Sequence, residues 1–338
     1  IIWSGEIGDI TEVHAWQGRA SWPQGMAKVP PPTPVPDTLN WDLWLGGAEW
    51  REFTSGDQEY EKFVEARRAS SGRPGGGRRR QTFGFYLPFN WRGFYDFGSG
   101  LIGDWGIHIL GPANWGLQLS PASLISVECV KKDTFPPFTF PDYLTIKYEF
   151  AAREGMPPVT VYWYNVQGDG YTPPGMTPDE AGKIGGQGPQ VGPPRVPRPG
   201  APPRTRPPDR SGYNCIMVGS KGYLGTSGRG EGVGLLPGTR WAEYELPDPY
   251  LTRSPGASTG SNGTAHVRDW IRACKGGVEA CSHFGVGGPF TEWLVLGATA
   301  VHAEGKLIWD NKKGEFSNNQ EVSQWVKPTY RKGWELKL

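Results

Sequence analysis

The sequence predicts an α+β fold built on a large, mainly antiparallel open sheet with helices on one face. Several runs alternate apolar and polar residues and are rich in valine, isoleucine, tyrosine and tryptophan, a pattern typical of half-buried strands. These runs follow one another with short turns and few intervening helices, which favours antiparallel pairing. The 50 glycines and 33 prolines among 338 residues indicate long loops between the elements.

The elements are expected in the following order. Strands are predicted at residues 10–15, 123–130, 143–150 and 159–164, and helices at residues 58–67, 104–118, 265–274 and 291–303. The last helix is rich in small and branched apolar residues and suits close packing on a sheet. Because no internal repeat is present, we treat residues 1–338 as one domain, with residues 182–212 as an exposed Pro/Gly-rich loop within it.

Composition excludes several classes of function. The 35 basic and 34 acidic residues leave a net charge of +1, so nothing favours nucleic acid or an anionic membrane as a partner. No run approaches the roughly 18 apolar residues of a membrane-spanning helix. The four cysteines show no C-x-x-C spacing, so neither a metal site nor a disulfide framework is indicated, and Cys274 and Cys281 are expected to be reduced and half-buried.

The most informative segment runs from Gly98 to His108 (GSGLIGDWGIH). If the part after Gly103 is helical, Asp104 and His108 share one helix face, where a carboxylate can orient an imidazole. The glycines also spell G-x-G-x-x-G, the dinucleotide fingerprint. Residues 90–97 are too polar for the buried strand that precedes such a loop, and no acidic residue follows about 20 positions later. We therefore expect a tight turn before a helix, and no cofactor-binding residues in this chain.

Several separated segments, read together, resemble one family. Residues 38–46 (TLNWDLWLG) are similar to its LDWDLWLG segment, and residues 89–108 are similar to its WRGFWDFGGGALGDWGCH segment. Further similarity is found at residues 273–277, 280–282, 288–292 and 330–334. On these motifs the chain resembles the glucose-fructose oxidoreductase and inositol dehydrogenase family (Gfo/Idh/MocA), in a bacterial branch whose members are often exported.

The resemblance implies a two-domain enzyme of which this chain is the second domain. In the family, an N-terminal Rossmann domain binds NAD or NADP, and an α+β domain supplies the substrate contacts and a sheet face for oligomerisation. The Rossmann domain and the family's Glu-Lys-Pro motif have no counterpart in these 338 residues. We expect them on a preceding segment or on a separate chain, and we expect this chain to be inactive without them. Both an exported and a cytoplasmic location remain open.

The resemblance also implies site residues. His108 matches the family's catalytic histidine, which exchanges the hydroxyl proton while hydride moves to or from the nicotinamide, and Asp104 matches the aspartate one helical turn before it. Aromatic and arginine side chains that suit a sugar or polyol are expected to bind the substrate. These residues are Trp16, Arg19, Trp22, Trp91, Arg92 and Tyr95. The alternative is that the tryptophans belong to the core.

Two positions depart from the family pattern. Gly111 stands where an acidic or amide residue is frequent, and His283 stands where an asparagine is frequent, and both changes would alter substrate choice.

Taken together, the sequence predicts the substrate-binding, catalytic half of an NAD(P)-dependent oxidoreductase that acts on a carbohydrate and assembles as a homo-oligomer. One alternative is a non-catalytic sheet module for oligomerisation or carbohydrate binding. Another is redox-assisted glycoside cleavage.

Overall fold

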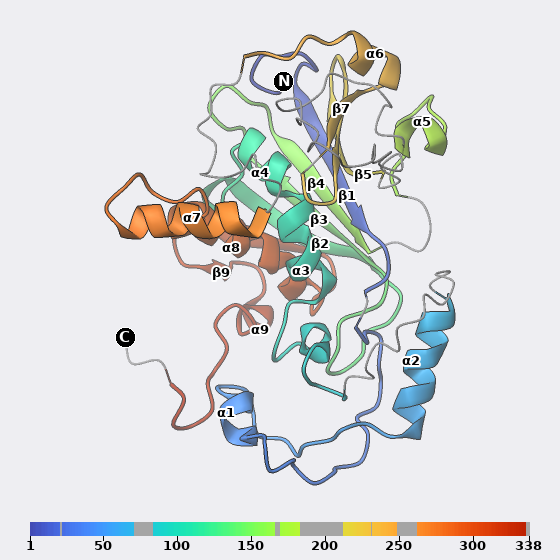
Figure 1. The fold of residues 1–338 in the computed structure, drawn as a ribbon, viewed down its shortest axis with the longest axis vertical. Coiled ribbons are helices and arrows are strands. Elements are labelled where there is room, and N and C mark those ends of the chain that lie inside the picture. Colours follow the sequence, from blue (N-terminus) through green and yellow to red (C-terminus); the bar gives the residue numbers. More distant parts are fainter. Residues whose placement is uncertain are drawn as a thin grey trace, which may run out of the picture.

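The computed structural model describes residues 1–20, 22–70, 84–165, 170–182, 212–230, 232–248 and 262–335. In these residues one open sheet runs in the strand order β7-β6-β5-β1-β4-β3-β2-β8-β9 (Figure 1). The strands are β1 (Ile10–Gln17), β2 (Leu124–Lys132), β3 (Leu144–Phe150), β4 (Val159–Asn165), β5 (Tyr213–Gly219), β6 (Gly222–Ser227), β7 (Val233–Leu236), β8 (Lys306–Asp310) and β9 (Glu315–Phe316).

The sheet is mixed, with one parallel pair among antiparallel neighbours. The parallel pair is β1 and β4, with Val13 opposite Val161, and the pairs on either side run antiparallel. This confirms the prediction of an α+β fold on a large, mainly antiparallel sheet. The four predicted strands correspond to β1 to β4, whereas β5 to β9 are additional strands.

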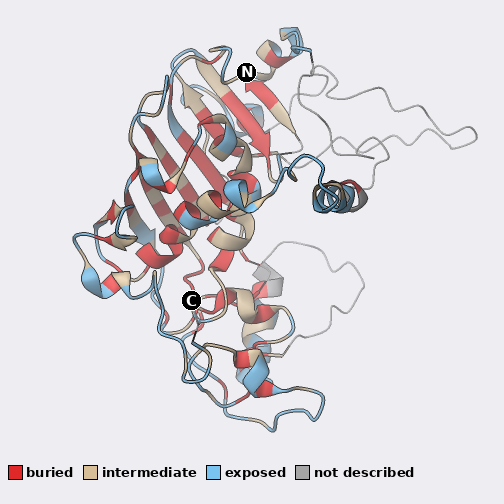
Figure 2. Ribbon diagram, turned by 90° about the vertical axis from the view of Figure 1, so that its left-hand side faces the viewer, coloured by how far each residue is buried: buried red, intermediate tan, exposed pale blue. Residues whose placement is uncertain are grey.

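The helices differ greatly in length. They are α1 (Trp41–Leu45), α2 (Gln58–Ser70), α3 (Gly100–Ile109), α4 (Gly111–Gly116), α5 (Pro178–Gly182), α6 (Gly238–Glu243), α7 (Asn262–Cys274), α8 (Phe284–Ala300) and α9 (Gln320–Ser323), with 3-10 helices η1 (Asn90–Gly93) and η2 (Pro121–Ser123). Figure 2 shows buried residues along the strands of the sheet, while α7 is exposed along most of its length.

Helices α3 and α8 cover one face of the sheet at close range. A Cβ added to Gly297 of α8 would lie 2.0 Å from the Tyr148 hydroxyl on β3 and 2.8 Å from Ile102 of α3. The Tyr148 hydroxyl donates to the carbonyl of Leu294 at 2.6 Å, which ties α8 to the sheet. Glycine at this crossing therefore lets three elements share one buried core.

Three sequence predictions about packing are corrected. The helix predicted at 104–118 is two helices, because Pro112 in the first turn of α4 lacks the amide proton that a continuous helix needs. Helices do not lie on one face only, since Ala181 of α5 packs with Trp16 and Ile216 on the face opposite α3. Cys274 and Cys281 are exposed, not half-buried. The predicted loop at 182–212 lies almost entirely outside the described residues.

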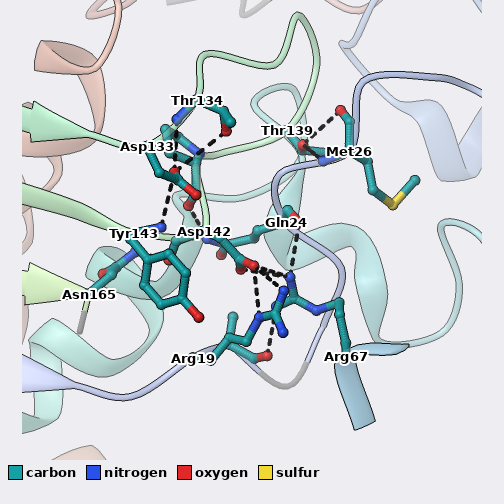
Figure 3. A network of polar contacts seen from close by, with 12 residues as sticks. Arg19, Gln24, Met26, Arg67, Asp133, Thr134, Thr139, Asp142, Tyr143 and Asn165 are labelled. Carbon is teal, nitrogen blue, oxygen red and sulfur yellow. Dashed lines mark hydrogen bonds and ion pairs between the residues drawn. The ribbon is translucent and has the colours of Figure 1, made fainter. Parts of the chain in front are cut away.

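A buried ion network fastens helix α2 to the loop before β3 (Figure 3). The Arg67 guanidinium donates from Nη1 to both carboxylate oxygens of Asp142 at 2.6 Å, and from Nη2 to the backbone carbonyl of Ala20 at 3.0 Å. Arg19 donates to the same carboxylate at 2.7 Å. Both arginines thus compensate one buried negative charge. The buried members of a second apolar cluster, which include Trp41, come from positions 26–94.

Candidate functional site

The glycines before α3 are required by the packing of the protein itself. Gly100 has a φ of +63°, and a Cβ there would lie 2.7 Å from the Phe140 ring. A Cβ on Gly98 would lie 2.7 Å from the carbonyl oxygen of Arg92, and one on Gly103 would lie 1.8 Å from the Ser99 hydroxyl. No strand precedes this turn, because Gly98 follows η1. The geometry does not fit a dinucleotide phosphate loop.

A surface hollow of about 460 Å³ lies at the N-terminal end of α3. Its lining comes from η1, α3 and the segment between them, and consists of Trp91, Arg92, Tyr95, Phe97, Gly98, Ser99, Gly100, Gly103 and Asp104. Four of the eight predicted site residues thus line one hollow. Its volume falls in the range of small-molecule sites, and its mixed lining suits a polar ligand with an apolar face.

Arg92 is the most constrained side chain of this hollow. Its Nε donates to the Asp104 carboxylate at 3.0 Å, and its Nη1 donates to the carbonyl of Phe89 at 3.1 Å. The guanidinium carbon also lies 4.6 Å from the centroid of the Trp91 ring. These contacts come from both sides of the turn, so they fix the guanidinium at the mouth of the hollow.

Asp104 and His108 occupy the predicted positions, one helical turn apart on α3, but they are not hydrogen-bonded to each other. The Asp104 carboxylate accepts from Arg92 instead. The His108 ring is exposed and meets the edge of Trp105, with centroids 5.8 Å apart and planes at 68°. The expected carboxylate-to-imidazole contact is therefore replaced by a carboxylate-to-guanidinium contact.

Three predicted substrate residues do not line the hollow. Trp22 is 1% exposed, and its indole nitrogen donates to Gln24 at 2.7 Å. Arg19 belongs to the Asp142 network, and Trp16 is buried on the opposite face of the sheet beneath Gly170. The alternative that tryptophans 16 and 22 form core is thus the one the structure supports.

Trp22 nevertheless packs against the backbone of η1, which lines the hollow. A Cβ on Gly93, the residue after Arg92, would lie 2.9 Å from the Trp22 ring and 2.3 Å from the carbonyl of Pro23. The backbone of η1 therefore rests directly on this buried indole. Trp22 thus supports the backbone next to Arg92 and does not line the hollow.

Tyr95 connects the hollow to residues that the sequence did not point out. Its ring lies 4.5 Å from His302 and 6.1 Å from Trp325, centroid to centroid, and His302 stacks on Trp325 at 3.8 Å. The Tyr95 hydroxyl is buried without a hydrogen-bond partner among the described residues, and burial raises its pKa. Burial, reinforced by the charge of Lys132, lowers the pKa of His302 to about 4.

Arg229 is a further residue that the sequence did not indicate, and it contacts Trp105 on α3. It lies in the turn between β6 and β7, and its guanidinium carbon lies 5.3 Å from the centroid of Trp105. The same indole therefore contacts both Arg229 and His108. Since 124 positions separate residues 105 and 229, only the fold brings Arg229 to this indole.

A second hollow, of about 480 Å³, lies at the start of the chain between Trp3, Glu154 and Lys221. It contains none of the predicted site residues.

None of the helices in the described ranges has the length and apolar character to cross a membrane.

No protein-family model matches the chain, and no match is found among curated proteins. Membership of the Gfo/Idh/MocA family therefore stays a prediction from the motifs. The positions of Asp104 and His108 on α3, and of Arg92 on η1 beside Asp104, do not depend on that prediction.

Proposed function

We propose that this chain is the substrate-binding and catalytic part of an NAD(P)-dependent oxidoreductase that acts on a sugar or polyol hydroxyl. The observation that carries the proposal is the arrangement on α3. An exposed histidine, His108, stands one turn from Asp104, which lines a hollow together with an indole and a fixed guanidinium. Family resemblance of the same segment supports the same reaction class.

The role proposed for His108 is proton transfer. A carbinol carbon gives up hydride readily only while its hydroxyl proton is removed, and an imidazole is the side chain best suited to accept that proton near neutral pH. His108 is exposed on α3 and has no hydrogen-bond partner in the described part of the chain, so its ring nitrogens are open to a substrate hydroxyl.

The hollow would hold the sugar. The Trp91 ring offers an apolar surface for the C–H face of a sugar, and the Arg92 guanidinium offers N–H donors for its hydroxyl oxygens. Asp104 is then a positioning residue, because its carboxylate holds Arg92 in place. Tyr95 completes the wall and links it to His302.

The hydride acceptor, NAD or NADP, would be bound by a domain outside these 338 residues, on a preceding segment or a separate chain. The glycines of residues 98–103 are packed against Arg92, Ser99 and Phe140, so they do not fit the nucleotide. We therefore give the residues of this chain no role in binding the cofactor. Their part is to bind the substrate and to move its hydroxyl proton.

The test is hydride transfer by the assembly of this chain with its dinucleotide-binding domain. A panel of sugars and polyols is offered with NAD⁺ or NADP⁺, and absorbance at the nicotinamide band is followed. His108→Ala should lower kcat by about 10²- to 10⁴-fold. The matched control is His266→Ala, because His266 is also an exposed histidine, on α7. This variant should leave the rate unchanged. Equal rates for the two variants would reject the catalytic role.

A second experiment tests whether the cofactor is bound by a domain other than this chain. NADH fluorescence is followed with the 338-residue chain and with a polypeptide extended upstream of Ile1. Only the extended polypeptide should bind at micromolar concentration. Micromolar binding by the 338-residue chain would show that the assignment of the cofactor to another domain is wrong.

We further propose that the sheet face opposite α3 pairs with a second copy of the chain. On β3 this face carries the ion pair of Lys147 and Glu149, whereas on β1 the ring of His14, which pairs with Glu12, is covered by Tyr171. The mass of the assembly by light scattering tests this proposal. A monomer at micromolar concentration would contradict it.

A further inference from the structure

The indole of Trp105 is shared by an imidazole and a guanidinium. His108, three residues further along α3, meets Trp105 at its edge, with centroids 5.8 Å apart. Arg229, from the turn after β6, lies over the ring with its guanidinium carbon 5.3 Å from the centroid. A positive charge and the proposed proton-transfer group therefore contact the same indole.

Two hydrogen bonds and one close contact hold the described residues on either side of Arg229. The Gly230 amide donates to the carbonyl of Ser227 at 2.9 Å, and the Gly232 amide donates to the Ser227 hydroxyl at 2.8 Å. Gly230 has a φ of +70°, and a Cβ there would lie 3.0 Å from Pro112 at the start of α4. The tip of the turn thus rests on the junction between α3 and α4.

Arg229 differs from Arg92 in how its charge is balanced. The Arg92 guanidinium is neutralised by Asp104 at 3.0 Å. Arg229 is exposed, and in the described ranges no carboxylate or carbonyl accepts a hydrogen bond from it. A guanidinium held by one face against an indole keeps its planar fork of N–H donors for a ligand, and that fork matches the two oxygens of a carboxylate.

We propose that Arg229 is the specificity-determining residue for an acidic substrate, and that it binds the carboxylate of a sugar acid whose hydroxyl lies at His108. This inference rests on the proposed function, because it takes a sugar held in the hollow beside Asp104 to extend along α3 to His108, which does not itself line the hollow. Neutral sugars lack the group that Arg229 binds. The chain therefore prefers a uronate or aldonate to the corresponding neutral sugar.

The test is direct binding to the 338-residue chain, measured by isothermal titration calorimetry. Sodium glucuronate is the acidic probe, and methyl glucoside is the neutral one. Glucuronate should bind about 10- to 100-fold more tightly at low salt, which is the scale of one charged hydrogen-bonded contact. Arg229→Met should remove this preference, and Arg229→Lys should restore only part of it, because lysine lacks the planar fork.

Arg268→Met provides the matched control, because Arg268 is an exposed arginine on α7. This variant should keep the full preference for glucuronate, which separates a local contact from a general loss of positive charge. Equal binding of the two probes by the natural chain, or an unchanged preference in Arg229→Met, would overturn the proposal. Far-UV circular dichroism of each variant checks that the fold is retained.

A second arm separates the substrate carboxylate from a phosphate of the dinucleotide. NADH is titrated into the assembly that binds it, with and without Arg229→Met. Weaker NADH binding with unchanged glucuronate binding would assign Arg229 to the dinucleotide and reject the sugar-acid proposal. Glucuronate binding that depends on Arg229, in an assembly that transfers no hydride, would retain the anion site and reject the proposed oxidoreductase function. The two failures are thus distinguishable.

Discussion

The Asp104 carboxylate accepts a hydrogen bond from Nε of Arg92 at 3.0 Å, and this contact joins helix α3 to the 3-10 helix η1. Both side chains are partly exposed, so the pair adds little to the stability of the fold. The main effect of this contact is on the orientation of the Arg92 guanidinium. Arg92 also stacks on Trp91 and reaches the backbone of Phe89, and Asp104 fixes the remaining direction of its guanidinium.

Asp104→Asn should therefore affect substrate binding more than proton transfer. In the assembly that carries the dinucleotide, we expect KM for the sugar to rise by about 5- to 30-fold, as for the loss of one charge-assisted contact. The kcat should change less, whereas His108→Ala should lower kcat. Steady-state kinetics on both variants measures the difference. A fall of kcat in Asp104→Asn equal to that in His108→Ala, with KM unchanged, would make Asp104 a direct partner of the histidine.

Strands β3 and β4 could be predicted from the alternation of their residues, and strand β5 could not. In β3 and β4 buried and half-buried residues alternate strictly, which is the pattern that local sequence can show. In β5, Cys215, Ile216 and Met217 are all buried, because α5 and its neighbouring segment cover the second face. The alternation is then lost, and the strand looks like any short apolar run.

The candidate site was predictable where its residues are neighbours in the chain. Trp91, Arg92 and Asp104 lie within 14 positions, and the structure brings them to one hollow. Trp22 was misplaced because an aromatic side chain looks the same in a sequence whether it packs beneath a backbone or lines a cleft. No local pattern could pair Arg229 with Trp105, since that contact depends on how the β6–β7 turn docks on α4.

Replacing Asp142 should destabilise the fold strongly. Asp142→Asn removes the negative charge that compensates Arg67, whose guanidinium is buried and cannot lose its proton. Breaking a buried pair on one side costs about 3–5 kcal/mol. Urea unfolding followed by circular dichroism measures the change in the free energy of unfolding.

The control for this change is Asp42→Asn. Asp42 also pairs with an arginine, Arg331, but its side chain is 53% exposed. The cost there should stay below about 1 kcal/mol, because the pair is partly solvated and Arg331 keeps its hydrogen bonds to the carbonyls of Asp42 and Gly46. Similar losses in the two variants would mean that the Arg67 charge is not buried in solution.

Adding one methyl group at Gly297 should separate α8 from the sheet. The new Cβ would lie 2.0 Å from the Tyr148 hydroxyl, which cannot withdraw without losing its hydrogen bond to Leu294. Overpacking of this kind costs about 1–3 kcal/mol, more than the gain of up to about 1 kcal/mol from replacing a helical glycine by alanine.

Gly287→Ala in the same helix is the matched control, because its Cβ would meet only the Ser282 carbonyl, at 3.9 Å. This variant should be neutral or slightly more stable. Thermal unfolding of both variants decides the matter. An equal or higher Tm for Gly297→Ala would mean that α8 packs on the sheet less closely than at the distances given above.

Glu149 should make the fold sensitive to acid. Hydrogen bonds from Lys147, Lys306 and Ser126 lower the pKa of its carboxyl to about 2, from an ordinary value of 4.5. Between these two values the unfolded chain binds more protons than the folded chain, so the free energy of unfolding falls as the pH falls. The contribution of Glu149 is fully present above about pH 5 and is lost as the pH approaches about 2.

Glu149→Gln lacks this contribution, so the difference in unfolding free energy between the natural chain and the variant should shrink steadily from pH 5 toward pH 2. Urea unfolding at pH 7, 5, 4, 3 and 2.5 measures that difference. Glu59→Gln is the control, because Glu59 pairs with Lys28 only across an exposed 3.5 Å contact. Its difference should be small at every pH, since exposed ion pairs contribute little. A Glu149→Gln difference that stays constant down to pH 2.5 would show that the two lysines do not hold this carboxylate in solution.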